Sequence, residues 1–385
     1  MDCEEIISRH ETLCQDTDFN YVRQWKAKRQ AKVVGFMPVY IPKELVVAAG
    51  MLPVGIMGAG DREIIRGDAY FQSYICRIPR STLELGVKGK LDFLDVFLFP
   101  AICDVIRNLS GMWKILFPKV FVKYLDLPQN FGPVGRKFYI GELEGLAADF
   151  ERLSGKKLTD QSLRSAIELY NENRRVLRDL YNLRAKFPHL VSTYDVYLLL
   201  RASNLLEVSE HTQCVSAYIR SAVKRQKPER DHVRVVISGA FCEQPPLALI
   251  KALEGSGCYI VDDDWVLGCR YLLSDISLTK QQNPMEALAD AYLTDTVSNA
   301  CRFETSRKGE FLIGQVKDRS AEGVIFAAPS FCDPALLERP MLQDALSAQG
   351  VAYTGFKYAE NTGQIQVIKE ETGTFADSIK LWGSR

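Results

Sequence analysis

The sequence predicts an α/β protein with two similar doubly wound parallel-sheet lobes and a helical middle region. Short apolar runs alternate with helical segments toward both ends of the 385-residue chain, which is typical of parallel sheets covered by helices. Between these parts, from about residue 142 to 225, the periodicity is that of long helices and glycine is rare. We expect an N-terminal helical segment over 1–31, a first lobe over 32–141, a helical region over 142–230 and a second lobe over 231–385.

Seven apolar runs have the length and composition of buried strands. They are expected at 33–37, 52–57, 95–99, 233–237, 259–261, 323–328 and 351–356. Pro42 and Pro246 open a helix after the first strand of each lobe, and Gly50 and Gly257 follow those helices. The order of elements is therefore the same in both lobes.

The same short pattern also follows a buried strand in each lobe. Pro-x-x-Cys-Asp occupies 100–104 and again 329–333. Such a repeat indicates two similar, flavodoxin-like lobes that face one another. Ligands of these sheets bind beyond the carboxyl ends of the strands, so Cys103 and Cys332 are expected to approach each other across a cleft. Cys76, which lies before the next strand, is expected to complete a triad.

Three thiolates in one cleft are suited to an iron–sulfur cluster. Thiolate sulfur selects iron–sulfur and zinc centres, and three ligands on a 4Fe-4S cluster leave one iron open. The alternative is plain burial, because free cysteine is among the most buried residue types. No Cys-x-x-Cys occurs among the ten cysteines, which argues against a ferredoxin-type cluster or a zinc ribbon. Cys242 follows a strand and is a further candidate for lining the cleft.

Composition and motifs argue against several other functions. Lys plus Arg equals Asp plus Glu at 48 each, so a generally electropositive surface for nucleic acid is not expected. The Gly-Ala-Gly segment at 58–60 lacks the third glycine of a dinucleotide fingerprint and predicts a turn, and no P-loop motif is present. The N-terminus is acidic and no window approaches roughly 18 apolar residues, so we expect a cytoplasmic protein with reduced thiols.

Several longer segments resemble one enzyme family over nearly the whole chain. They are Pro-Lys-Glu-Leu-Val-Val-Ala-Ala-Gly-Met-Leu-Pro-Val at 42–54, Cys76 with Arg77, the segment 95–104 with its Cys-Asp, the turn at Gly239, Val-Asp-Asp-Asp at 261–264 and Phe-Cys-Asp-Pro at 331–334. On these segments the chain resembles the 2-hydroxyacyl-CoA dehydratase and benzoyl-CoA reductase family. It looks most like the gamma (C) subunits of the class I, ATP-dependent benzoyl-CoA reductases.

The resemblance implies a cofactor, a reaction and a set of partners. The matching Cys76, Cys103 and Cys332 would hold one 4Fe-4S cluster. The subunit would take part in the two-electron, dearomatising reduction of benzoyl-CoA to a cyclic dienoyl-CoA. The implied partners are a homologous second cluster-bearing subunit, ATP-hydrolysing activator subunits, ferredoxin as the upstream electron donor and an acyl-CoA substrate.

Two alternatives stay open. A subunit of a 2-hydroxyacyl-CoA dehydratase would use the same cluster to eliminate water through a ketyl radical, and would need ATP only for an initial activation. A non-catalytic scaffold subunit would contain the same cysteines as ordinary buried residues, without iron. The chain also departs from the family pattern at 368–370, where Ile-Lys-Glu stands in place of the usual Thr-Arg, so the role of that arginine has no residue assigned.

Overall fold

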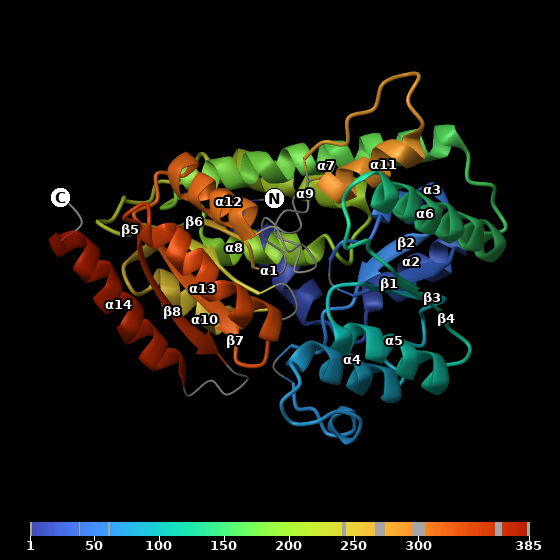
Figure 1. Ribbon diagram of the computed structural model, residues 1–385, viewed down its shortest axis with the longest axis horizontal. Coiled ribbons are helices and arrows are strands. Elements are labelled where there is room, and N and C mark those ends of the chain that lie inside the picture. The colour runs from blue at the N-terminus through green and yellow to red at the C-terminus, as the bar shows by residue number, and fades with distance from the viewer. Residues whose placement is uncertain are drawn as a thin grey trace.

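Two four-stranded parallel sheets frame the part of the chain that the structure describes (Figure 1). The structure is a computed structural model that describes residues 2–37, 39–60, 62–240, 244–265, 274–294, 305–358 and 364–382. Its strands are β1 (Val33–Phe36), β2 (Leu52–Gly55), β3 (Val96–Pro100), β4 (Phe121–Leu125), β5 (Val233–Ser238), β6 (Cys258–Asp263), β7 (Gly323–Pro329) and β8 (Ala352–Tyr358). The order is β2-β1-β3-β4 in the first sheet and β6-β5-β7-β8 in the second. The shared order confirms the prediction of two similar, flavodoxin-like lobes.

Helices cover both sheets and fill the space between them. They are α1 (Cys3–Gln15), α2 (Asn20–Arg29), α3 (Lys43–Ala48), the 3₁₀ turn η1 (Gly67–Ala69), α4 (Arg77–Val87), α5 (Asp104–Leu116), α6 (Pro133–Ser154), α7 (Asp160–Lys186), α8 (Thr193–Ala202), α9 (Val208–Ala222), α10 (Leu247–Glu254), α11 (Pro284–Thr294), α12 (Thr305–Asp318), α13 (Asp333–Ser347) and α14 (Ile365–Trp382). α5 packs against β3 and β4, whereas α12, α13 and α14 pack against the second sheet. None of the described helices is long and apolar enough to cross a membrane.

The first strand–helix unit shows how local sequence builds these elements. All four residues of β1 are buried, as expected for an inner strand of a parallel sheet covered on both faces. Pro42 is the N-cap of α3, and Gly50 follows the helix with a φ of +73°, in the left-handed region that glycine adopts readily. The second lobe repeats this arrangement, with Pro246 before α10 and Gly257 at a φ of +89° before β6.

The long helix α7 connects the two lobes. It packs against α3 of the first lobe and β6 of the second, and runs along the top of the molecule in Figure 1. Its 27 residues make it about 40 Å long. The fully buried Arg184 donates a hydrogen bond from Nη2 to Oδ2 of Asp263, on β6, at 2.9 Å. Burial acts to lower the pKa of Arg184, but the adjacent Asp263 carboxylate raises it overall.

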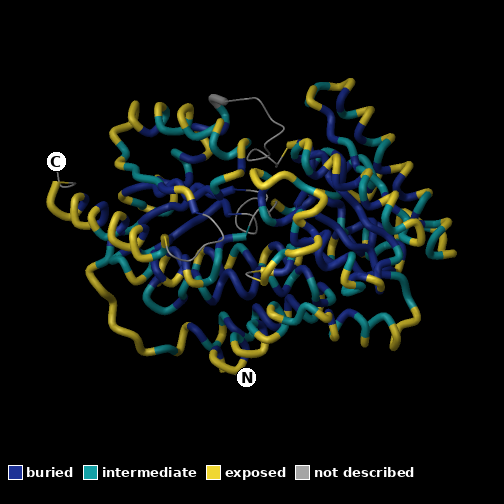
Figure 2. Tube along the Cα trace, turned by 90° about the horizontal axis from the view of Figure 1, so that it is seen from below, coloured by how far each residue is buried: buried dark blue, intermediate teal, exposed yellow. Residues whose placement is uncertain are grey.

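A continuous cluster of buried side chains extends from the first lobe through α7 into the second. Figure 2 shows buried segments in both halves of the molecule, with the exposed segments at its periphery. A smaller cluster on the second sheet lies between β5, β7 and α12 and includes Val236, Val324 and Leu312. The two lobes therefore share a core.

Each predicted strand is present, with ends within two residues of those expected. The helical stretch starts earlier than predicted, because α6 begins at Pro133. The sequence also failed to indicate β4. This strand pairs only with β3 in the first sheet, and three of its five residues are partly exposed, so it lacks the apolar run that marks an inner strand.

Candidate functional site

Cys103 and Cys332 occupy equivalent positions in the two lobes. Cys103 follows β3 and is the N-cap of α5, while Cys332 follows β7 and is the N-cap of α13. β3 lies between β1 and β4 in its sheet, as β7 lies between β5 and β8. The structure therefore places the cysteine of each Pro-x-x-Cys-Asp segment just beyond the carboxyl end of an inner strand.

Cys76 is the N-cap of α4, so all three cysteines begin a helix. Cys76 is 5% exposed and Cys332 is 1% exposed, whereas Cys103 is partly buried. At a helix N-terminus the backbone N–H groups lack partners within the helix, and the aligned peptide dipoles favour negative charge. Such positions stabilise thiolates and negatively charged clusters.

The electrostatic environment of Cys103 includes both of the other cysteines. Burial raises the pKa of the Cys103 thiol to about 12, although the backbone N–H of Ile106 acts to lower it. Negative charge on Cys76, Asp104 and Cys332 raises this pKa further. Interactions of this kind require the side chains to share one region. The charge of Cys332, from the second lobe, therefore acts on Cys103 of the first lobe, as does that of Cys76.

The chemistry of these donors fits an iron–sulfur cluster. Thiol sulfur is the ligand that such clusters use, and a bound metal deprotonates a thiol that otherwise stays neutral. The helix N-termini beside the thiols suit the negative charge that results. Across the described ranges, however, no three Cys, His, Asp or Glu side chains form a ready-made metal-binding group. The assignment of ligands therefore rests on the position and chemistry of Cys76, Cys103 and Cys332.

Other cysteines of the described part have ordinary structural surroundings. The thiol of Cys3 lies 3.6 Å from the carbonyl oxygen of Tyr218, and that of Cys14 lies 3.8 Å from the carbonyl oxygen of Leu198. Burial raises the pKa of Cys14 to about 11. The sequence candidate Cys242 lies outside the described residues.

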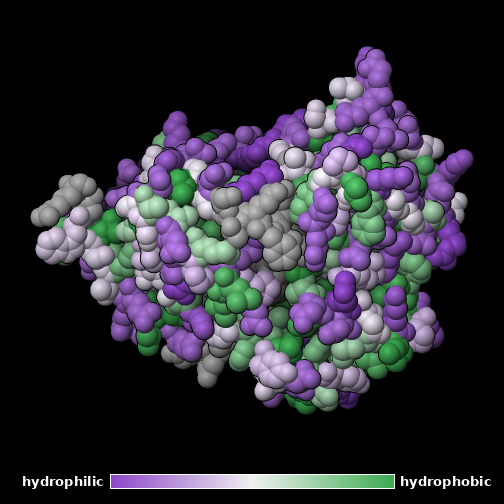
Figure 3. All heavy atoms as spheres, viewed as in Figure 1, coloured by the Kyte–Doolittle hydropathy of each residue, from purple (hydrophilic) through white to green (hydrophobic). Residues whose placement is uncertain are grey.

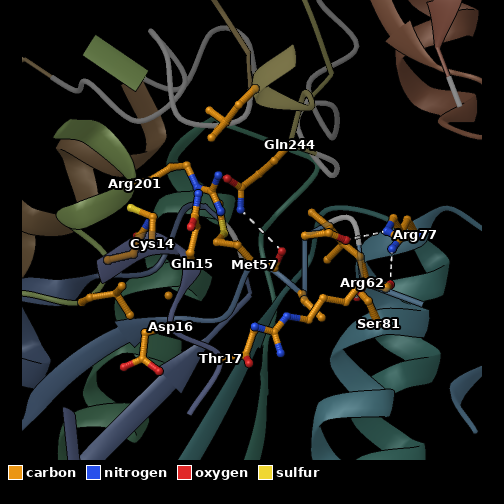
Figure 4. Close-up of a pocket in the computed structure, with 18 of the residues that line it drawn as sticks. Cys14, Gln15, Asp16, Thr17, Met57, Arg62, Arg77, Ser81, Arg201 and Gln244 are labelled. Carbon is orange, nitrogen blue, oxygen red and sulfur yellow. Dashed lines mark hydrogen bonds between the residues drawn. The ribbon is translucent and has the colours of Figure 1, made fainter. Parts of the chain in front are cut away.

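A cavity of about 440 Å³ lies beside the start of α4 (Figure 4). Its walls come from the end of α1, the segment after β2, the start of α4, the end of α8 and the segment before α10, so both lobes contribute. Arg77, the neighbour of Cys76, donates hydrogen bonds to the carbonyl oxygens of Gly60, at 2.7 Å, and Arg62. Gly58 and Gly60 have φ values of +71° and +62°, which confirms the predicted turn.

Two cavity residues of the helical region were not found from the sequence. Arg201 is on α8 and Asn204 lies just after it, within a stretch whose pattern indicates only a helix. No local motif marks either residue, because they reach the cavity through the packing of α8 against α1 and α10. The only available signal was their position near the end of a helix.

Comparison with known proteins identifies the family. Residues 38–379 match a family model described as 2-hydroxyglutaryl-CoA dehydratase, D-component. The chain belongs to this family. The family expected from the sequence motifs is thereby confirmed.

Members of this dehydratase family match the chain over most of its length. It is 54% identical to the C subunit of the benzoyl-CoA reductase of Thauera aromatica, over 99% of this chain and 100% of that protein. It is 29% identical to the (R)-phenyllactyl-CoA dehydratase beta subunit of Clostridium sporogenes, over 86% of this chain and 88% of that protein. It is 28% identical to the beta subunit of (R)-2-hydroxyglutaryl-CoA dehydratase of Acidaminococcus fermentans, over 92% and 94% respectively. The chain is thus related to enzyme subunits.

Proposed function

We propose that the chain is the iron–sulfur subunit of an ATP-dependent benzoyl-CoA reductase. Cys76, Cys103 and Cys332 are the proposed ligands of one 4Fe-4S cluster. The observation that carries this proposal is the 54% identity to the C subunit of a benzoyl-CoA reductase over practically the whole of both chains. The shared position of the three cysteines at helix N-termini supports it. When bound, the cluster supplies a carrier for single electrons.

The chain itself prepares the site for such a carrier. Burial of Cys76 and Cys332 keeps water and oxygen away from the sulfur atoms. Backbone N–H groups at the starts of α4, α5 and α13 stabilise negative charge there, and hydrogen bonds to sulfur tune a reduction potential. The proposed reaction adds two electrons and two protons to benzoyl-CoA and yields a cyclic dienoyl-CoA. ATP hydrolysis on partner subunits drives the electron transfer.

The surface beside two of the cysteines supports the proposal of a partner subunit. Tyr74, next but one to Cys76 in the chain, is 63% exposed, and Phe331, which precedes Cys332, is 47% exposed. Leu337 on α13 is 75% exposed, and Figure 3 shows apolar surface over this helix. Exposed apolar side chains of this kind are typical of protein interfaces. The proposed partners are a homologous cluster-bearing subunit and the ATP-hydrolysing activator subunits, with ferredoxin as the upstream donor.

The decisive experiment measures iron and acid-labile sulfide, with EPR spectra, on protein purified without oxygen. We expect about four irons per chain in the wild type and loss of iron in Cys76→Ala, Cys103→Ala and Cys332→Ala. Cys214→Ala is the matched control, because Cys214 is buried on α9 among the helices. Full iron retention in one of the three variants would remove that cysteine from the ligand set. Absence of iron from the wild type would favour a scaffold subunit.

A second candidate function is favoured by the other relatives. The family model and the relatives at 29% and 28% identity are named for 2-hydroxyacyl-CoA dehydratases. Turnover with the partner subunits separates the two reactions. A reductase consumes ATP with every electron pair and accepts benzoyl-CoA, whereas a dehydratase continues to eliminate water from a 2-hydroxyacyl-CoA after one activation.

A further inference from the structure

A second pocket lies at the edge of the first sheet that is opposite to the cysteines. Its lining includes Lys32, Met51 and Asp95, the residues that come immediately before β1, β2 and β3. It therefore lies at the amino ends of these parallel strands, whereas Cys103 follows the carboxyl end of β3. Its volume is about 320 Å³, which is within the range of small-molecule pockets. We call it the basic pocket.

The charged lining of the basic pocket is mostly positive. It consists of Lys26, Arg29, Lys32 and Lys156 against a single acid, Asp95. The Asp95 carboxylate is already shared, because Nζ of Lys26 lies 2.7 Å from its Oδ2 and Nζ of Lys32 lies 3.6 Å from its Oδ1. Its Oδ2 also accepts a hydrogen bond from the first N–H of β1 at 2.8 Å. One carboxylate therefore serves two lysines and leaves positive charge in the pocket unbalanced.

Lys156 contributes most of this unbalanced charge. Within the described ranges its ammonium group forms no ion pair, whereas Arg29 pairs with Glu207 at 3.3 Å. The Lys156 side chain nevertheless lies against the protein, because a Cβ at position 50 would be 2.8 Å from its Nζ. An exposed lysine normally extends into water, where its ammonium stays hydrated and its side chain keeps its rotamer freedom. The pocket thus holds an ammonium group that has hydrogen bonds to donate and no counter-ion.

Helix ends at the pocket do not account for its lysines. The helices α2, α3 and α6 end there, and lysines often bind the last carbonyl oxygens of a helix. However, the carbonyls of residues 45–47 in α3 already accept hydrogen bonds from the backbone N–H groups of residues 49–51. Lys26 donates to the carbonyl of Phe93, which is not part of a helix. Three helix ends carry a charge of about −1.5 in total, which is smaller than the excess of the four cations over Asp95.

A phosphate group fits this set of donors. The lysine ammonium is a compact point charge and a common ligand of phosphate. The oxygens of a phosphate dianion can accept hydrogen bonds from several ammonium groups at once, and its charge offsets more of the excess than a single carboxylate does. Ala31, Ala49 and Met51 add apolar wall, so the pocket has room for an organic part beside the phosphate.

We propose that the basic pocket binds a small molecule that carries one or more phosphate groups. Lys32 and Lys156 bind the phosphate oxygens, and Arg29 adds positive charge at the rim. The inference goes beyond the proposed function, because the pocket lies at the other edge of the sheet and needs neither the cluster nor an acyl-CoA. Inorganic pyrophosphate is a suitable probe, since it carries the charge of such a ligand without its organic part.

The test is isothermal titration calorimetry with pyrophosphate on the anaerobically purified full chain. We expect saturable binding that weakens as the salt concentration rises. Lys156→Gln and Lys32→Gln should each weaken binding about fivefold, the effect of losing one ion pair at a partly exposed site. Lys157→Gln is the matched control, because Lys157 is the next residue in the chain and has the same charge but does not line the pocket. This variant should bind as the wild type does.

Four results would overturn the proposal. They are no binding of pyrophosphate to the wild type, unchanged affinity in Lys156→Gln, equal weakening in Lys157→Gln, or displacement of pyrophosphate by benzoyl-CoA. Equal weakening would indicate only general surface charge, and displacement would make the pocket part of an acyl-CoA site. Lys156 and Lys157 are exposed, so we expect both variants to fold, and thermal unfolding verifies this.

Iron content measured on the same samples separates this inference from the proposed function. Iron at wild-type level without pyrophosphate binding overturns the pocket and leaves the proposed function intact. Pyrophosphate binding with the expected response of the variants supports the pocket even where iron is absent.

Discussion

His211 makes the folded chain sensitive to acid in a way that can be measured. Its ring is buried on α9, where Nδ1 accepts a hydrogen bond from Nδ2 of Asn173 at 2.8 Å and Nε2 donates to the Leu199 carbonyl at 2.9 Å. Both contacts fit the neutral ring, because a proton on Nδ1 would face an N–H of Asn173. Burial lowers the pKa of His211 to about 3, and the nearby His10 and Lys43 contribute to the shift.

The sign and size of the effect follow from the two protonation states. In the unfolded chain the pKa of a histidine is about 6.5. Above this pH the ring is neutral in both states, so it does not make the free energy of unfolding depend on pH. Below it, the unfolded chain binds a proton that the folded chain does not accept. The free energy of unfolding then falls by about 1.4 kcal/mol per pH unit down to about pH 3. Between pH 7 and pH 5 the loss due to His211 is about 2 kcal/mol.

Urea unfolding followed by circular dichroism at pH 7 and pH 5 tests this reasoning. His211→Gln keeps a donor for the Leu199 carbonyl and removes the titrating ring. We expect the wild type to lose about 2 kcal/mol more than this variant between the two pH values. His189→Gln, at a partly exposed position, should behave as the wild type does. An equal pH dependence of wild type and His211→Gln, or an NMR titration with His211 near its ordinary pKa, would refute the argument.

Three further predictions concern stability. Arg184→Met leaves the Asp263 carboxylate buried without its cationic partner, so we expect the free energy of unfolding in urea to fall by about 3–5 kcal/mol. The double variant with Asp263→Leu should recover most of this loss. Gly239→Ala would place a Cβ 2.0 Å from Cδ1 of Trp265. We therefore expect a changed tryptophan emission spectrum and a lower melting temperature. An unchanged spectrum would contradict the close packing of Trp265 against Gly239. Gly50→Ala places an alanine at a φ of +73°, so we expect the free energy of unfolding to fall by about 1–2 kcal/mol. A variant as stable as the wild type would show that the backbone at position 50 relaxes without this cost.

The parts of the structure that could be predicted depend on local signals. Pro42 and Gly50 mark the ends of α3 because their backbones permit those positions, and the Pro-x-x-Cys-Asp segments follow apolar runs that are recognisable as inner strands. The equivalent positions of Cys103 and Cys332 could be predicted because both lobes repeat one topology, which places equivalent loops at equivalent sheet edges. The proposed cofactor and reaction came from family resemblance, since residue spacing alone left buried cysteines as an alternative.

The parts that could not be predicted depend on contacts between distant segments. Asn204 has no motif, and its lack of a partner is visible only once α8, β2 and α10 are packed around the cavity. Likewise, nothing near Arg184 in the sequence indicates a partner on β6. Charged residues on a long helix are usually solvated, so the sequence pattern favours an exposed arginine where the structure has a buried one.

The long helix α7, which contacts both lobes, also affects when the chain can fold during synthesis. α7 leaves the ribosome more than seventy residues ahead of β6, the strand of the second lobe against which it packs. Until β6 has emerged, Arg184 has no carboxylate beside it, and the apolar side chains that will enter the common core stay open to water. We therefore expect the common core to be completed only after β6 has been synthesised, and apolar surface that stays exposed until then favours aggregation. The two lobes resemble each other, but they complete one core together.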